Sequence, residues 1–186
     1  KLEFAVADKV TRIKVILPRK ALYVEDTNLV IHVPAASRLS VNTVSADIGV
    51  QAVHGTQRLQ SVSGDLRTET SGEDLECRTV SGDVTIAGSG RKGLVSITTV
   101  SGNASATRLA GEVNGSTVSG DFTLAVGATT RSRLRSTSGN LTLRPFYRGE
   151  LDGRRVLLAD DVRNTGQTFA RAAALAREAG ATVLAT

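Results

Sequence analysis

The chain has 186 residues, 40% of them hydrophobic, which leaves room for one globular domain or for one domain and a fragment of a second. Aromatic residues make up only 3% and Trp is absent, so the core must be built from Val, Leu, Ile and Ala, which suit narrow, closely stacked sheets. The formal net charge is +5, but Lys and Arg form no run with interleaved aromatic residues, which argues against a nucleic-acid-binding surface.

The first forty residues contain two candidate strands. Residues 11–18 read as a strand that ends at Pro18, and residues 29–34 read as a second strand that ends at Pro34. This segment could supply part of the cap that the open end of a repeat stack needs. The chain holds no Met, so we expect it to be a processed piece from which an export signal could have been removed. No apolar run approaches the ~18 residues of a membrane-spanning helix.

A five-residue pattern, Val-Ser-Gly-Asp followed by an apolar residue, dominates the chain up to residue 141. The six copies begin at Val44, Val62, Val80, Val100, Val118 and Thr137. The steps between them are 18, 18, 20, 18 and 19 residues. A nearly constant step indicates a stack of structurally equivalent units.

Strand geometry predicts two columns of side chains, because successive residues of a strand point to opposite faces. The Val, the Gly and the last apolar residue of each copy should share the inner face, and the preceding Ser or Thr, the Ser and the Asp or Asn should share the outer face. The last apolar residues form a predicted inner column of Ile48, Leu66, Val84, Ala104, Phe122 and Leu141. The acidic or amide residues form a predicted outer column of Asp47, Asp65, Asp83, Asn103, Asp121 and Asn140.

Weaker strand segments lie between the copies, at residues 75–79, 94–99 and 133–136, and Gly-containing turns precede them. Each unit of about 19 residues therefore holds two or three short strands. The sequence predicts an all-β fold, a parallel β-solenoid whose rungs share one core. A rolled antiparallel sheet of hairpins is the alternative.

Few side chains of the repeat suggest chemistry. The outer Asp/Asn column could bond to nearby backbone at turns, or its oxygens could favour Ca²⁺. Cys77 has no partner for a disulfide, and we interpret it as a buried structural thiol. His32 and His54 lie far apart in sequence and read as structural or surface residues. No Ser–His–Asp grouping is suggested.

The repeat, with residues 30–34 (Val-Ile-His-Val-Pro) ahead of it, resembles a bacterial adhesin-like family with Ser-Gly-Asp β-strand repeats. The resemblance covers roughly residues 1–141. It implies a β-solenoid-like fold and an exported or membrane-anchored protein of the cell envelope. The family is largely of unknown function, and the resemblance supplies no catalytic residues.

After residue 143 the repeat stops and the pattern changes. Residues 156–159 read as a buried strand, followed by two carboxylates and a Gly-containing loop. Residues 169–179 read as a helix, with Thr168 as its N-cap and Gly180 as its stop. Residues 181–185 read as a further strand, so this tail predicts one βαβ fragment.

This tail resembles the phosphoribosyl pyrophosphate motif of type I phosphoribosyltransferases. By that resemblance the ligand-binding residues are Asp160, Asp161, Thr165, Gly166, Gln167 and Thr168. The two carboxylates would bond to ribose hydroxyls, and the loop at the helix N-terminus would hold the 5′-phosphate, with Mg²⁺ as the accompanying ion. The family's pyrophosphate loop, flexible loop and base-binding hood have no counterpart upstream, so we predict no catalysis. The tail either packs on the end of the solenoid or marks a chimera, formed by fusion, frameshift or assembly join.

The sequence thus predicts two domains, a repeat solenoid at residues 1–143 and a phosphoribosyltransferase-like fragment at residues 144–186. We predict a non-enzymatic structural or interaction domain, periplasmic or at the cell surface, with no cofactor. Its repeat face would bind an envelope protein or a surface ligand, not nucleic acid, and any membrane anchor would lie outside this chain. The alternative function is binding of phosphoribosyl pyrophosphate, with Mg²⁺, through the tail.

Overall fold

The computed structural model describes residues 2–8, 10–16, 28–145, 155–160 and 182–185, together with Ala174 and Arg177. The chain divides into two compact units, Lys1–His32 and Val33–Thr186. Among the described residues, no helix combines the length and the apolar character needed to cross a membrane.

The first unit contains one antiparallel hairpin of strands β1 (Leu2–Ala7) and β2 (Val10–Val15). Asp8 takes up a left-handed conformation, with φ of 49°, at the turn between them. The strand predicted at residues 11–18 is found here as β2. The strand predicted at residues 29–34 is wrong, because residues 28–34 are described without strand structure. Strand propensity reflects packing against neighbours, and Leu29, Val30 and Ile31 are all exposed.

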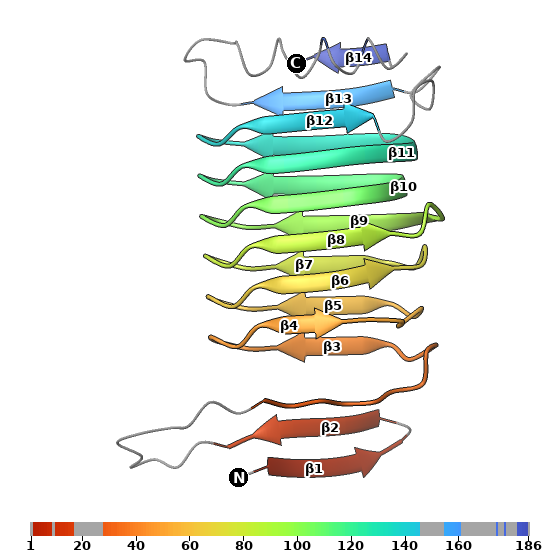
Figure 1. Ribbon diagram of the computed structural model, residues 1–186, viewed down its shortest axis with the longest axis vertical. Helices are drawn as coiled ribbons and strands as arrows, with labels where there is room; N and C mark the ends of the chain where they lie inside the picture. Colours follow the sequence, from red (N-terminus) through yellow and green to blue (C-terminus); the bar gives the residue numbers. More distant parts are fainter. Residues whose placement is uncertain are drawn as a thin grey trace. The chain divides into compact units, whose positions relative to one another are not determined.

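The second unit is a stack of parallel strands that forms two sheets (Figure 1). Sheet 1 contains β4 (Ile48–Val50), β6 (Leu66–Thr70), β8 (Val84–Gly88), the first parts of β10 (Ala104–Thr117) and β11 (Phe122–Ser136), and β12 (Leu141–Pro145). Sheet 2 contains β3 (Leu39–Asn42), β5 (Gln57–Gln60), β7 (Leu75–Arg78), β9 (Lys92–Thr98), the later parts of β10 and β11, β13 (Arg155–Asp160) and β14 (Thr182–Ala185).

Every described strand pair of this unit is parallel, which confirms the solenoid and excludes the antiparallel alternative. Each turn of the stack passes through sheet 1, crosses a corner into sheet 2 and returns through the Val-Ser-Gly-Asp corner. Equivalent residues of successive copies are register partners: Leu66 lies opposite Ile48 on one side and opposite Val84 on the other. The repeat period in the sequence is therefore the length of one turn.

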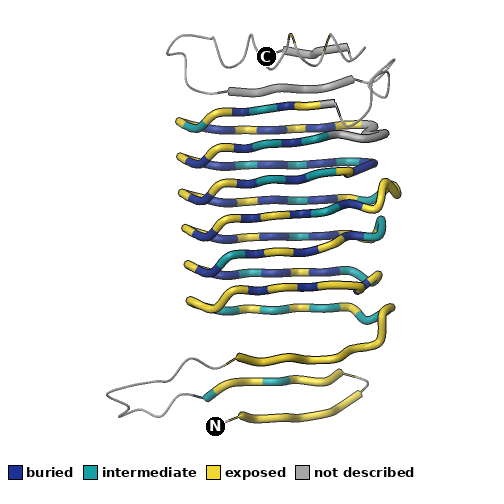
Figure 2. Tube along the Cα trace, viewed as in Figure 1, coloured by how far each residue is buried: buried dark blue, intermediate teal, exposed yellow. Residues whose placement is uncertain are grey.

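Buried residues alternate with more exposed ones along the strands of the stack (Figure 2), and buried hydrophobic residues of both sheets form one core cluster. The predicted inner column is confirmed, because all six of its side chains are buried: Ile48, Leu66, Val84, Ala104, Phe122 and Leu141. Sheet 2 contributes its own inward side chains, among them Leu59, Cys77 and Ile97. Alternate residues of both sheets thus exclude water together, and no single turn could do so alone.

The predicted faces are wrong at the corner itself. The valines that begin the first five copies are 40–71% exposed, while the Ser or Thr residues before the second to sixth copies are buried: Ser61, Thr79, Thr99, Thr117 and Ser136. The period-two rule assumes an extended chain, whereas the Val-Ser-Gly segment bends from sheet 2 into sheet 1. The bend turns the valine outward and the preceding hydroxyl inward.

The tail continues the stack rather than forming a separate sheet. β13 pairs in parallel with the later part of β11, and β14 pairs in parallel with β13. Both tail strands predicted from the sequence are present, and Ala174 and Arg177 between them are helical. The tail strands therefore extend sheet 2 at the end of the solenoid.

Candidate functional site

The repeated corner holds the stack together with side-chain hydroxyls. In each copy from the second to the sixth, the backbone N–H of the Gly donates to the Ser or Thr three residues earlier, at 2.9–3.1 Å. These hydroxyls belong to buried residues, and the Gly N–H satisfies an acceptor oxygen that the core would otherwise separate from water. The Ser or Thr before each copy is therefore a structural cap of the corner.

The Asp/Asn column forms a ladder of hydrogen bonds between turns. Oδ1 of Asp47 accepts the backbone N–H of Asp65 at 2.8 Å, and Oδ1 of Asp65 accepts that of Asp83 at 2.9 Å. The same bond recurs three more times, up to Asn140. We expected bonds to local backbone. The observed acceptors instead reach the backbone of the next turn, and each of the five bonds occupies one oxygen of its side chain.

Asn103 interrupts the charges of this ladder between Asp83 and Asp121. Successive turns lie about 4.8 Å apart, so an unbroken row of carboxylates would repel itself. The amide oxygen of Asn103 makes the same bond to the next turn, at 3.0 Å, without adding a charge. The described residues contain no group of three or more His, Cys, Asp or Glu side chains placed to hold a metal ion.

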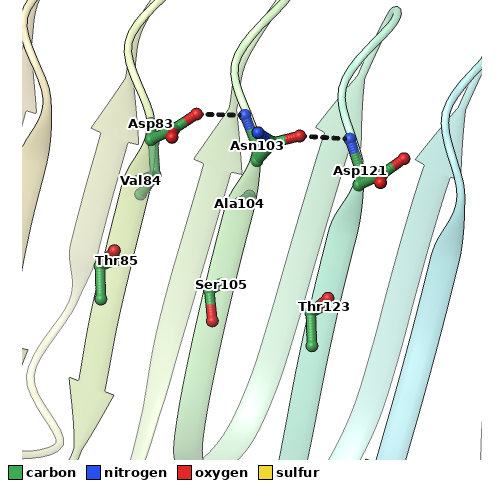
Figure 3. Close-up of a pocket in the computed structure, with 8 residues that line it drawn as sticks. All are labelled: Asp83, Val84, Thr85, Asn103, Ala104, Ser105, Asp121 and Thr123. Atoms are coloured by element: carbon green, nitrogen blue, oxygen red, sulfur yellow. Dashed lines mark hydrogen bonds between the residues drawn. The ribbon is translucent and has the colours of Figure 1, made fainter.

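Beside the ladder, the outer face of sheet 1 carries a shallow depression of about 300 Å³ (Figure 3). Its lining residues come from three successive turns: Asp83, Val84, Thr85, Asn103, Ala104, Ser105, Asp121 and Thr123. Figure 3 shows the hydroxyl side chains in one row beside the two ladder bonds between Asp83, Asn103 and Asp121. The surface offers hydroxyls and carboxylates to a polar ligand, and its lining residues include no His, Lys or Arg.

The two histidines and the cysteine do not join this surface. Nδ1 of His54 is hydrogen-bonded to Oγ of Ser71 on an exposed part of the opposite corner, so it has a partner that sequence reasoning did not identify. His32 is exposed in the first unit. Cys77 is fully buried in sheet 2, as expected, and burial, together with the nearby Glu76 carboxylate, raises the pKa of its thiol to about 12. A thiol with this pKa is a poor nucleophile at neutral pH.

The predicted phosphoribosyl pyrophosphate ligands lie mostly outside the described residues. Asp160 is the last residue of β13, and its backbone is the register partner of Ser136. Asp161, Thr165, Gly166, Gln167 and Thr168 are not among the described residues. Of these six residues, the described part of the chain includes Asp160 alone.

Sequence reasoning missed a row of arginines on the outer face of sheet 2. Arg131, Arg133 and Arg135 occupy alternate, exposed positions of β11. The signal was present as Arg-Ser-Arg-Leu-Arg, because strand alternation places the first, third and fifth residues of such a segment on one face.

Comparison with protein families matches residues 3–146 to Toastrack DUF4097. Comparisons with curated proteins and with solved structures gave no match. The family match includes all six copies of the repeat and both sheets up to β12, and it ends before β13. The match covers well over half of the chain, and the chain therefore belongs to the Toastrack DUF4097 family, a family of repeat domains of unknown function.

Proposed function

We propose that this chain is a non-enzymatic structural or interaction domain of the bacterial cell envelope, with an adhesin-like role. The observation that carries the proposal is the use of polar side chains along the repeat. The Asp/Asn ladder and the Ser/Thr caps bind backbone of the same corner or of the next turn, so they maintain the stack.

Such a stack suits a domain that acts as a rigid spacer or that presents a binding surface to a partner. Every turn is tied to the next by parallel strand pairing on both sheets and by the ladder at the corner. Polar outward side chains from several turns lie in regular rows, which gives an extended and repetitive face to a partner. The likeness of the repeat to exported and membrane-anchored envelope proteins supports the location.

The location is tested with the full-length protein, tagged at its C-terminus and expressed in its native host. Fractions of cytoplasm, periplasm and membrane are compared, and intact cells are treated with an external protease. We expect the protein in the periplasm, in the membrane fraction or at the protease-accessible surface. Recovery in the cytoplasm of cells whose cytoplasmic and periplasmic marker enzymes separate cleanly would overturn the envelope proposal.

A further inference from the structure

The depression on the outer face of sheet 1 contains polar groups that the fold does not use. The ladder occupies Oδ1 of Asp83, of Asn103 and of Asp121. Within the described part of the chain, the second carboxylate oxygens of the two aspartates and the amide nitrogen of the asparagine bond to no other protein group. The hydroxyls in the row beside them also have no protein partner there: Thr85, Ser105 and Thr123. These six groups are therefore open to a ligand (Figure 3).

The chemistry of the six groups selects the class of ligand. Hydroxyls donate and accept hydrogen bonds, a carboxylate oxygen only accepts them, and an amide nitrogen only donates them. An anion such as a phosphate would meet two carboxylates and no cation among the lining residues. The apolar lining residues Val84 and Ala104 are each 1% exposed, so they offer no surface to an apolar ligand. A molecule with many hydroxyls, which both donate and accept, fits this surface best.

The second copy of the repeat fills the equivalent positions differently. The residue two places after its ladder aspartate, Asp65, is Arg67, and the two side chains form an ion pair at 3.5 Å. In the third to fifth copies a hydroxyl-bearing residue takes this place, and the next outward residue is shorter than an arginine: Ala87, Thr107 and Ala125. The long side chains of the second copy therefore give the depression a boundary on this side.

The size of the surface also suits a short sugar chain. Three turns span two steps of about 4.8 Å, and along each strand the ladder residue lies about 6.6 Å from the residue that bears the hydroxyl. The depression holds about 300 Å³, which is at the lower limit of the volumes of small-molecule sites. An open and shallow surface of this volume predicts weak binding, with a dissociation constant in the millimolar range.

We propose that the depression between Asp83 and Asp121 binds a neutral glycan, whose hydroxyls bond to the free carboxylate oxygens of the ladder and to the row of Thr and Ser hydroxyls beside it. Polar groups that recur from turn to turn offer similar contacts to successive sugar units. The proposal deepens the interaction role proposed above and rests on it. Its test uses purified protein, so failure of glycan binding is distinguishable from failure of the envelope location, which cell fractionation measures.

The test is a titration of the isotope-labelled full chain with three neutral trisaccharides, cellotriose, maltotriose and the trimer of N-acetylglucosamine, followed by the chemical shifts of the backbone amides. We expect at least one trisaccharide to shift the signals of residues 83–85, 103–105 and 121–123 progressively and to leave those of sheet 2 unchanged. Added salt should not change the affinity, because a neutral ligand has no charge that salt could screen.

Two double variants test the role of the hydroxyls. Ser105→Ala/Thr123→Val removes one Ser and one Thr hydroxyl from the depression, and Ser96→Ala/Thr98→Val removes the same two types from β9 in sheet 2. We expect the first variant to raise the dissociation constant about fivefold or more, because each lost hydrogen bond weakens binding, and the second to change it less than about twofold. The amide spectrum of each variant reports whether it is folded, and the shifts of the wild type test the site without any substitution.

No shift with any of the three trisaccharides would overturn the proposal, and so would shifts centred outside the depression. Equal losses of affinity in the two double variants would overturn it too, because binding would then not depend on the hydroxyls of this surface. Spermidine serves as a cationic probe. Salt-sensitive binding of spermidine at the same residues, stronger than that of every trisaccharide, would assign the two carboxylates to a cationic ligand and reject the glycan.

Discussion

Gly102 shows how closely the turns approach at the corner. A Cβ atom at this position would lie 1.9 Å from the carbonyl oxygen of Gly82 in the turn before it, and the other corner glycines meet the same obstacle. The first copy has Ala46 in this place. No earlier copy of the repeat precedes Ala46. Its methyl group, which the later corners have no space for, is therefore accepted there.

We predict that Gly102→Ala lowers the free energy of unfolding by about 3 kcal/mol or prevents folding, because the methyl group forces two backbones apart. Gly49→Ala is the matched control, since a Cβ there meets nothing within 4 Å. The control should be neutral, or stabilising by less than about 1 kcal/mol, through the unfolded chain. Urea unfolding followed by circular dichroism measures both. Equal effects at the two positions would mean that the close approach of successive turns does not restrict which residue the corner accepts.

We predict that the buried thiol of Cys77 makes the fold less stable at alkaline pH. The pKa of its thiol rises from 9.0 to about 12 on folding, first because burial disfavours the thiolate and second because Glu76 is negative. The folded chain therefore holds this proton when the unfolded chain has lost it. The protonated thiol contributes fully to the free energy of unfolding below pH 9. This contribution declines as pH rises from about 9 towards 12, by roughly 1 kcal/mol per pH unit.

The measurement is urea unfolding of the wild type and of Cys77→Ala between neutral pH and about pH 10.5. Cys77→Ala should be less stable at neutral pH because it leaves a cavity, but its stability should fall less steeply above pH 9. Parallel slopes in the two proteins would show that the thiol does not contribute to the alkaline loss.

At the scale of elements, the Asp/Asn ladder links the corner of each turn to the corner of the next. The ladder accepts a backbone N–H at every step, and Asp and Asn perform this task equally, as the bonds from Asp83 at 2.7 Å and from Asn103 at 3.0 Å show. The column therefore requires a side chain that carries an acceptor oxygen and is as long as that of Asp or Asn.

We predict that Asp83→Asn changes the free energy of unfolding by less than about 0.5 kcal/mol, whereas Asp83→Ala costs about 1 kcal/mol because the N–H of Asn103 loses its acceptor. Chemical denaturation of the two variants at moderate salt measures the difference. If Asp83→Asn is as destabilising as Asp83→Ala, the charge of the carboxylate matters and not the hydrogen bond.

The outward valines and the inward hydroxyls show where the alternation of inward and outward residues stops predicting which side chains are buried. Alternation predicted the inner column correctly, because Leu66 and its equivalents lie inside regular strands. It failed at Val62 and Ser61, because the chain bends there and the period of two no longer applies. It also failed for residues 29–34, because an apolar, β-branched segment becomes a strand only where a neighbouring strand is available.

At the scale of the molecule, the stack should tolerate loss of a whole turn. Deleting residues 64–81 joins Ser63 to Gly82 and removes 18 residues, which is one repeat step. Because contacts are made between successive turns, the remaining turns should stack in the same register and shorten the solenoid by about 4.8 Å.

Deleting only residues 64–72 is the control, since half a step would place sheet 1 residues in sheet 2 positions. We expect cooperative unfolding and a β-type circular dichroism spectrum for the first variant and an unfolded chain for the second. A first variant that fails to fold while the wild type folds would show that the turns are not interchangeable.

The tail carries the remaining prediction. The described strands β13 and β14 extend sheet 2, and Asp160 ends β13 as the sequence suggested. If the resemblance to the phosphoribosyl pyrophosphate motif reflects function, calorimetric titration with that ligand and Mg²⁺ should give heat that disappears in Asp160→Asn/Asp161→Asn. An interaction domain without this function should give no heat at millimolar ligand.

The sequence by itself determined the period of the stack and the residues of its inner column, because these follow from a repeated pattern that every turn satisfies in the same way. It favoured a parallel order, and the strand pairing of the structure decided between this order and a rolled antiparallel sheet. Only the tertiary structure decided how the corner bends, which side chain reaches the backbone of the next turn and which outward residues stand together. The ladder bond from Asp83 joins residues 20 positions apart. Such relations depend on how one turn lies on the next, which local strand preferences do not specify.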